Sequence, residues 1–248
     1  MNFCNATILI TGGNSGIGRG LAEALAKRGA KIIITGRDRN RLQEVVDANP
    51  GMFGYELDVT SADLQTFAAT VVADHPDLNV IVHNAGILPY ERILADRYDT
   101  KIVDNVMLTN FIAPIRITAA LLPHLRSKLE AAIVTVSSGL AFVPLASASA
   151  YSASKAAVHS WSQSMRYELR STNISVVEIA PPLVATELTP GQSSNPHAMP
   201  LDAFITEAVE LLCAEITPKE VLVQRVLPQR TAEQTGNFDK IFNMINPA

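Results

Sequence analysis

The feature that most constrains the fold of this chain is the regular alternation of short apolar runs with longer helical patterns. The apolar runs are rich in β-branched residues and nearly continuous, which is typical of strands buried on both faces of a parallel sheet. The predicted strands are 6–11, 31–35, 53–57, 80–83, 132–136, 174–180 and 220–223. The predicted helices between and after them are 16–27, 39–48, 61–74, 100–128, 151–170 and 201–213.

Strand–helix alternation of this kind requires right-handed crossovers between parallel strands. It therefore predicts an α/β fold of the Rossmann type, a doubly wound, seven-stranded and mostly parallel sheet with helices on both faces. Because no linker or change of composition divides the chain, residues 1–248 are expected to form a single domain. Segment 183–200 is rich in Pro and Ser, and so long a loop in a compact domain is predicted to be a lid over a site. Phe238, Phe242 and Met244 follow a helical spacing, which predicts a terminal helix packed on the body.

Composition excludes several classes of protein. With 48% hydrophobic and 18% charged residues, a chain of 248 residues can bury a large core and is not disordered. A net charge of −4 without a basic cluster argues against nucleic-acid binding. Cys4 and Cys213 are far apart in sequence and lack metal-ligand spacing, so neither a disulfide framework nor a metal site is expected.

Location is predicted from the absence of targeting signals. The first residues show neither a basic start nor an apolar stretch, and the cysteine usage fits a reducing compartment, so we expect a cytoplasmic protein. Residues 131–154 carry no charge and are long enough for a membrane span. Their many serines, with Gly139 and Pro144, instead indicate a buried strand followed by a loop, and no membrane association is predicted.

A glycine-rich turn follows the first predicted strand and leads into a helix. Its glycines permit a sharp turn and close approach of a pyrophosphate, while the helix N-terminus offers free N–H groups and a positive dipole end. The predicted contacts to a dinucleotide here are Gly12, Asn14, Ser15, Gly16, Ile17 and Gly18. A methyltransferase also places a glycine-rich turn after its first strand, so this turn alone leaves the class of enzyme open.

The end of the second predicted strand bears on the choice of cofactor. An acid at this point commonly binds the ribose 2′-hydroxyl of NAD. Here Gly36 occupies that place and Arg37 follows it. Because a guanidinium is planar and always charged, it suits a 2′-phosphate, and NADP(H) is favoured over NAD(H), which stays possible. The alternative is that Arg37 and Arg39 are solvated charges at a helix start.

A second group of polar residues lies later in the chain. Tyr151 and Lys155 are four residues apart at the start of a predicted helix and therefore on one face of it. A lysine ammonium near a phenol favours the phenolate and lowers its pKa, which yields an acid/base that works near neutral pH. Ser138 precedes Tyr151 by thirteen residues and ends the fifth predicted strand, where open α/β sheets place their sites.

Taken in order, these motifs resemble the short-chain dehydrogenase/reductase family over residues 7–186. The matching residues are loop 11–18 (TGGNSGIG), Asp58 and Val59, the segment Asn84, Ala85 and Gly86, and the set Asn110, Ser138, Tyr151 and Lys155. The resemblance implies that Tyr151 exchanges a proton with the substrate oxygen and that Ser138 hydrogen-bonds this oxygen. It also implies that Lys155 holds the nicotinamide ribose and that Asn110 positions a water.

The sequence departs from the family pattern after the sixth strand. The usual Pro-Gly is Pro181-Pro182 here, and Pro182 removes a backbone donor. The resemblance still implies cofactor contacts from Pro181, Val184 and Thr186. The chain also lacks a glycine-rich C-terminal ending like that of carrier-protein reductases. The Pro-Pro turn and the tail LPQRT look more like the DltE-like branch of bacterial oxidoreductases.

The predicted substrate walls are mostly apolar and follow the cofactor motifs. They are Leu88, Tyr90, Ser138, Leu140, Phe142, Pro182 and Leu183. They predict a hydrophobic ketone, aldehyde or secondary alcohol as substrate. His83 and His159, which end a strand and lie inside a helix, are predicted to be structural.

The preferred interpretation is an NADP(H)-dependent oxidoreductase that uses Tyr151 as acid/base. One alternative is a catalytically weak sensor that binds a dinucleotide and a protein partner, although such proteins usually lose the tyrosine or the lysine. A methyltransferase would need neither residue. By resemblance, helices 100–128 and 151–170 are expected to form the interface of a homodimer or homotetramer.

Overall fold

A parallel sheet runs through the centre of the molecule. The computed structural model describes residues 1–61, 63–94 and 98–247. Within them the sheet has seven strands in the order β3-β2-β1-β4-β5-β6-β7, and every strand pair is parallel. The strands are β1 (Thr7–Ile10), β2 (Lys31–Gly36), β3 (Phe53–Glu56), β4 (Val80–His83), β5 (Ala131–Val136), β6 (Ile174–Ile179) and β7 (Glu220–Val221). The predicted α/β architecture is confirmed.

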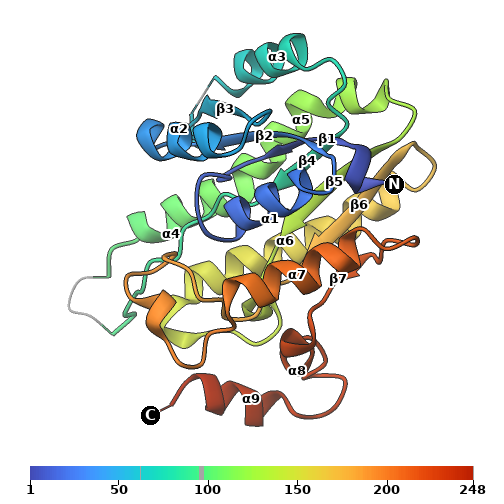
Figure 1. The fold of residues 1–248 in the computed structure, drawn as a ribbon. Helices are drawn as coiled ribbons and strands as arrows, with labels where there is room; N and C mark the ends of the chain where they lie inside the picture. Colours follow the sequence, from blue (N-terminus) through green and yellow to red (C-terminus); the bar gives the residue numbers. More distant parts are fainter. Residues whose placement is uncertain (62, 95–97, 248) are drawn as a thin grey trace.

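Helices cover both faces of this sheet (Figure 1). They are α1 (Gly16–Ala26), α2 (Arg39–Ala48), α3 (Leu64–Asp74), α4 (Lys101–Met107), α5 (Ala113–Arg126), α6 (Ser149–Glu168), α7 (Leu201–Leu212), α8 (Leu227–Arg230) and α9 (Phe238–Ile245). Ile8 and Ile10 of β1 pack in one core with α1, α2 and α7, whereas Leu9 packs in a second core with α3, α5 and α6. Alternate residues of a strand point to opposite faces, so the central strands must be apolar throughout.

Two helices differ most from their predicted extents, whereas the others lie within two residues of them. The helix expected over 61–74 begins at Leu64, because the Asp63 side chain caps it by accepting a hydrogen bond from the Thr66 N–H. Ala62, inside the predicted start, lies outside the described residues. The helix expected over 100–128 is interrupted by a π-helical turn at Leu108–Ile112, which separates α4 from α5.

The stretch Lys101–Arg126 is, within the described residues, the one helix long and apolar enough to cross a membrane by length and composition. Ile117, Leu121 and Leu125 on its inner side are nevertheless buried in the core against the sheet. Such burial is what a core helix shows. The uncharged stretch over 131–154 forms β5, a loop and the beginning of α6, as the sequence predicts.

The two cysteines lie closer together than their positions in the sequence suggest. Both Cys4 and Cys213 are free thiols. Burial raises the pKa of the Cys213 thiol to about 11, with a further contribution from a hydrogen bond with Cys4. The fold thus brings the N-terminal turn against the end of α7, although no disulfide joins them.

The C-terminal helix confirms the helical spacing seen in the sequence. The rings of Phe238 and Phe242 stack with their centroids 5.9 Å apart. Both rings pack around Val143, Ala232 and Ile241, a small core separate from the two that flank the sheet. This contact places α9 under the loop that follows β5.

Candidate active site

One large cleft lies where the carboxyl ends of β1, β2, β4, β5 and β6 meet loops and helix ends. Its volume is about 2170 Å³. This is where open α/β sheets bind ligands, because the strand order reverses between β1 and β4. Of the predicted cofactor contacts, it is lined by Gly12, Asn14, Ser15, Gly16, Ile17, Arg37, Asp58, Val59, Asn84, Ala85, Gly86, Tyr151, Lys155, Pro181, Val184 and Thr186.

The glycine-rich turn is fixed by close backbone contacts. Gly12 has φ +66°, a left-handed conformation that favours glycine. The Asn84 amide donates hydrogen bonds to the carbonyls of Thr11 at 2.9 Å and Gly12 at 3.1 Å. A Cβ at Gly18 would collide with this same amide. Gly18 therefore serves packing rather than the cleft wall, while the N-terminus of α1 faces the cleft with free N–H groups.

The end of β2 is positively charged. Arg37 is exposed and lines the cleft, and the adjacent Gly36 lies tightly against Asn14, so a Cβ there would displace the Asn14 side chain. Asp58 faces the same region. Hydrogen bonds from the Thr60 N–H and hydroxyl lower the pKa of Asp58, and the charge of Arg37 lowers it further. At this end of the cleft the Arg37 guanidinium can bind an anion, and the Asp58 carboxylate is held in place nearby by Thr60.

Ser138, Tyr151 and Lys155 meet at the carboxyl end of β5. All three are buried and line the cleft. The Lys155 ammonium donates a hydrogen bond to the Val136 carbonyl at 2.8 Å and lies 5.5 Å from the centre of the Tyr151 ring. The Ser138 hydroxyl accepts a hydrogen bond from the Leu140 N–H at 3.1 Å, which turns the chain directly after β5.

Burial dominates the protonation of this group. It raises the pKa of Tyr151 to about 12, and a hydrogen bond with Ser138 opposes the rise. It lowers the pKa of Lys155 to about 8, and the charge of Glu178 opposes the fall. The expectation that Lys155 lowers the pKa of Tyr151 is therefore wrong for the protein in this structure. The cause is desolvation, which disfavours the charged form of each side chain.

Asn110 lies on the π-helical turn and does not line the cleft. Its side-chain oxygen accepts a hydrogen bond from the Ile87 N–H at 2.9 Å, and its amide donates to the Ile87 carbonyl and the Ser154 hydroxyl at 3.0 Å each. The side chain thus holds the segment after β4 against α6. π-turns are frequent at functional sites because they redirect one side chain without breaking the helix.

The substrate end of the cleft contains most of the residues predicted for it. Leu88, Tyr90, Leu140, Pro182 and Leu183 line it together with Ser138. Phe142 does not line it, because its ring packs edge-on against His159, with centroids 4.9 Å apart, and beneath the Arg230 guanidinium. The prediction of Phe142 as a substrate wall is not supported by this position.

Sequence reasoning missed the contribution of the C-terminal elements to the cleft. Gln229 of α8 and Ile241, Met244 and Ile245 of α9 line its substrate end. Their helical spacing was visible in the sequence. Their place in the cleft depends on how the tail packs on the loop after β5, where Gln229 lies against Gly139 and α9 against Val143, and no local signal specifies this packing.

Glu91 was also missed. Its carboxylate accepts hydrogen bonds from the Ala150 N–H, from the Ser149 hydroxyl at 2.7 Å and from the Tyr98 hydroxyl at 2.5 Å. Burial raises the pKa of Glu91, but these bonds outweigh burial and lower it. Glu91 therefore anchors the first turn of α6, the helix that carries Tyr151 and Lys155.

Comparison with known proteins agrees with this geometry. Residues 6–197 match the profile of the short chain dehydrogenase family. The chain belongs to this family. It is 34% identical to the uncharacterized oxidoreductase DltE of Bacillus subtilis over 99% of its own length and 98% of that protein.

Solved structures of short chain dehydrogenases superpose on most of the chain. The enzyme of Burkholderia cenocepacia in complex with NADP has a TM-score of 0.81 at 24% identity and covers both chains completely. The 3-ketoacyl-(acyl-carrier-protein) reductase of Brucella melitensis, complexed with NADH, has a TM-score of 0.77 at 26% identity, over 88% of this chain and 95% of that one. The protein is thus an oxidoreductase of the short chain dehydrogenase family.

Proposed function

We propose that this short chain dehydrogenase transfers a hydride from NADPH to an apolar ketone or aldehyde, or in the reverse direction from an apolar secondary alcohol to NADP⁺. The observation that carries the proposal is the meeting of Ser138, Tyr151 and Lys155 in a cleft whose other end holds the glycine-rich turn and Arg37. Hydride transfer from a nicotinamide requires a dinucleotide site and, near the reacting carbonyl, a proton donor, and the two ends of this cleft provide them.

The residues of the cleft fit a nicotinamide dinucleotide. The backbone of loop 11–18 and the N-terminus of α1 would bind the pyrophosphate, and Asp58 and Val59 would face the adenine. Arg37 beside Gly36 favours a 2′-phosphate, hence NADP(H) over NAD(H). Both cofactors occur in the similar structures named above, so the preference rests on Arg37 alone.

The cofactor, when bound, supplies the hydride, and the protein supplies orientation and a proton. Tyr151 donates its phenolic proton to the carbonyl oxygen, and Ser138 hydrogen-bonds the same oxygen. Because the pKa of Tyr151 is raised to about 12, the phenol is protonated at neutral pH and can donate the proton that reduction of the carbonyl requires. The Lys155 ammonium would bind the nicotinamide ribose and, once it does so, favour the phenolate after proton transfer.

Several further residues shape the site. Asn110 would position the Ile87 segment, and the water expected beside it stays a prediction. Segment 183–200 would act as a lid, since Leu183, Val184 and Thr186 line the cleft and Val184 is bridged to Met199. Pro182 would stiffen the wall at its base. Residues 1–248 would then work as one domain.

We also propose that the enzyme is a homo-oligomer. The π-helical turn between α4 and α5 leaves Ile112 exposed, and α6 leaves Ala156 and Ser160 exposed; these residues are small or apolar enough for a second copy to pack on them. A dimer or tetramer built this way matches the expectation from sequence. Cytoplasmic location stays a prediction.

The test of the proposed function is a parallel fluorescence titration with NADPH and NADH, followed by assays on apolar ketones and aldehydes. Binding of NADPH at least tenfold tighter than NADH is expected, with the difference lost in Arg37→Ala. Tyr151→Phe is the matched control for chemistry: it should bind NADPH like the wild type and lose turnover. Equal loss of both cofactors in Arg37→Ala, or full turnover in Tyr151→Phe, would contradict the proposal.

A further inference from the structure

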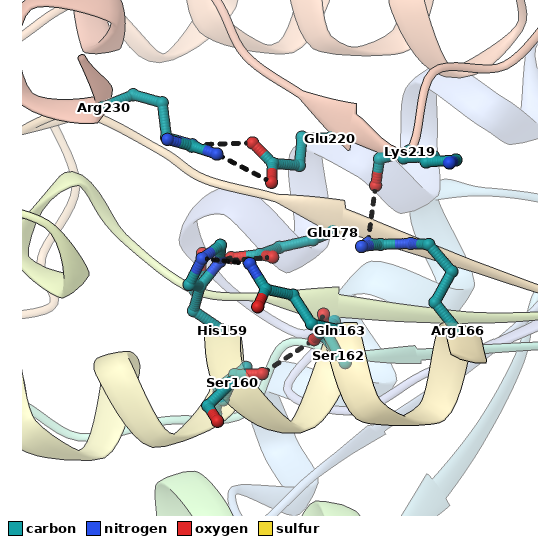
Figure 2. Close-up of polar contacts among 12 residues, drawn as sticks. His159, Ser160, Ser162, Gln163, Arg166, Glu178, Lys219, Glu220 and Arg230 are labelled. Atoms are coloured by element: carbon teal, nitrogen blue, oxygen red, sulfur yellow. Dashed lines mark hydrogen bonds and ion pairs between the residues drawn. The ribbon is translucent and has the colours of Figure 1, made fainter. Parts of the chain in front are cut away.

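A buried acidic group lies directly behind the active-site helix (Figure 2). Glu178 of β6 is completely buried, and both of its carboxylate oxygens face His159 Nδ1, at 2.8 and 3.0 Å. The other ring nitrogen of His159 lies 2.8 Å from the Gln163 amide nitrogen. Because that nitrogen only donates, His159 Nε2 accepts and Nδ1 carries the ring proton. The Nδ1 proton of His159 therefore points at the Glu178 carboxylate.

The neighbouring acid has its own positive partner. Glu220 of β7 accepts two hydrogen bonds from the Arg230 guanidinium, at 2.7 and 3.2 Å (Figure 2). Arg166 of α6 donates to the carbonyls of Val176 and Lys219. The charge of Arg166 also acts on Glu220, and the charge of Glu178 is felt by Arg230. Among the described residues, His159 is the only basic side chain within 4.0 Å of the Glu178 carboxylate.

The sheet register brings Glu178 toward Lys155. Glu178 pairs with Thr135 of β5, and the next residue along β5, Val136, accepts the hydrogen bond of the Lys155 ammonium. His159, the partner of Glu178, lies one turn beyond Lys155 on α6 and on the same face. The two side chains of α6 therefore approach β5 and β6 at adjacent positions.

We propose that Glu178 is the counter-ion of Lys155 and thereby a positioning residue of the reaction, which keeps the Lys155 side chain charged and directed toward the cofactor site. The inference rests on the proposed function, in which Lys155 holds the nicotinamide ribose. His159 orients the carboxylate, and Gln163 fixes the His159 ring. The protonation behaviour agrees: burial lowers the pKa of Lys155 to about 8, and the charge of Glu178 limits this fall.

The same cluster has the spacing of a metal site, since ligand atoms of His159, Glu178 and Glu220 lie within 4.8 Å of one another. The charges favour the counter-ion instead. Arg230 already neutralises Glu220 with a two-pronged pair, and the His159 Nδ1 proton already faces Glu178.

Neutralising Glu178 has a defined consequence for pH dependence. Without its charge, the pKa of Lys155 falls further below 8, and the ammonium is lost at lower pH. The alkaline limb of NADPH binding and turnover is then expected to shift to lower pH by about one unit, a tenfold change in the proton affinity of Lys155. Affinity for NADPH at acidic pH is expected to stay close to that of the wild type.

The experiment compares Glu178→Gln with the wild type, using NADPH fluorescence titrations from weakly acidic to alkaline pH. Glutamine keeps the volume and can still accept from His159. Glu220→Gln is the matched control, since it removes a charge from the same cluster that Arg230 already balances. A shift in Glu178→Gln and none in Glu220→Gln supports the proposal. The proposal is overturned if Glu178→Gln loses NADPH binding at the same alkaline pH as the wild type, or if Glu178→Gln and Glu220→Gln shift this pH equally.

A readout independent of activity separates this inference from the proposed function. The Lys155 side chain can be titrated by NMR in protein carrying ¹³C-labelled lysine, its signal assigned by absence in Lys155→Arg. A lower pKa of Lys155 in Glu178→Gln supports the counter-ion even if the enzyme prefers another cofactor. An unchanged pKa overturns it even if NADPH binds.

Should Glu178→Gln fail to fold, Glu178→Asp takes its place. It keeps the charge but shortens the side chain by one methylene. The alkaline limb of NADPH binding is then expected to shift to lower pH, by less than is expected for Glu178→Gln. A limb identical to that of the wild type in folded Glu178→Asp would overturn the proposal.

Discussion

Lys155 is held in a position that costs the folded protein stability. Its pKa falls from 10.5 to about 8 on folding, mainly because the ammonium is buried. Between these values the unfolded chain binds a proton that the folded protein does not. Stability therefore decreases as the pH falls from 10.5 toward 8 and stays reduced below 8. This net shift already includes the attraction of Glu178, and it corresponds to about 3 kcal/mol.

The prediction at this position is that Lys155→Met is more stable than the wild type at pH 7. Methionine removes the buried charge but also the hydrogen bond to Val136, which is worth about 1 kcal/mol. A net gain of about 2 kcal/mol is expected in urea unfolding without cofactor; it should disappear at about pH 10, and above that pH the variant should be less stable by about 1 kcal/mol. A variant less stable than the wild type at pH 7 would mean that Lys155 stabilises the fold.

Single residues also define how far sequence reasoning reaches. Ser138, Tyr151 and Lys155 could be assigned to one site because their spacing, strand end and helix start are local features. The direction of the Tyr151 pKa could not, since it depends on the burial that other segments provide. Phe142 failed as a substrate wall for a similar reason: its ring turns toward His159 and Arg230, residues far along the chain.

At the scale of elements, α6 depends on an acid from another segment. The helix starts at Ser149 without a side-chain cap from its own N-cap residue, Ala148. Glu91 supplies the missing acceptor to the Ala150 N–H. A carboxylate here also suits the positive end of the helix. The position of Tyr151 thus depends on the loop after β4 as well as on the sheet.

Glu91→Gln is expected to lower the free energy of unfolding by about 1–2 kcal/mol at pH 7, since a charged acceptor of several hydrogen bonds is lost. The pKa of Glu91 is lowered in the fold, so its contribution is present above the ordinary value of 4.5 and disappears as the pH falls through the lower folded value. The two proteins should then converge in stability in acid. Glu168→Gln, at the exposed end of the same helix, is the control and should change little.

The C-terminal helix predicts a separation of substrate from cofactor binding. Met244 lines the substrate end of the cleft and is 68% exposed, so a polar residue there should not disturb folding. Met244→Lys is expected to lower kcat/KM for an apolar carbonyl substrate by about tenfold, because the substrate loses the apolar surface of one side chain that it would contact. The dissociation constant of NADPH should not change. Equal loss of NADPH affinity would place α9 at the cofactor end instead.

For the whole molecule, the sequence predicts the sheet well and the cleft only in part. Continuous apolar strands and their crossovers leave few arrangements, and each predicted strand lies within a few residues of the structure. The π-helical turn at Asn110, the cap by Glu91 and the packing of α9 on the loop after β5 arise from contacts between distant segments. Such contacts leave no periodic signal in the chain.

The long helical stretch Lys101–Arg126 bears on how whole molecules associate. Only 39% of its most apolar window is buried within the chain. Its inner side packs on the sheet through Ile117 and Leu121, as the inner side of a core helix does. A second copy of the chain can cover the outer side, with the exposed Ala156 and Ser160 of α6 allowing close approach of helices.

Ala156→Arg should therefore separate the copies. A charged side chain with its bulk would be buried without a partner in a helix–helix interface, while in a monomer it is simply solvated. Sedimentation equilibrium is expected to give at least a dimer for the wild type and a monomer of 26.7 kDa for the variant. Lys101→Arg, an exposed exchange at the start of α4, is the control and should keep the wild-type mass. A wild type that sediments as a monomer would contradict the proposed homo-oligomer.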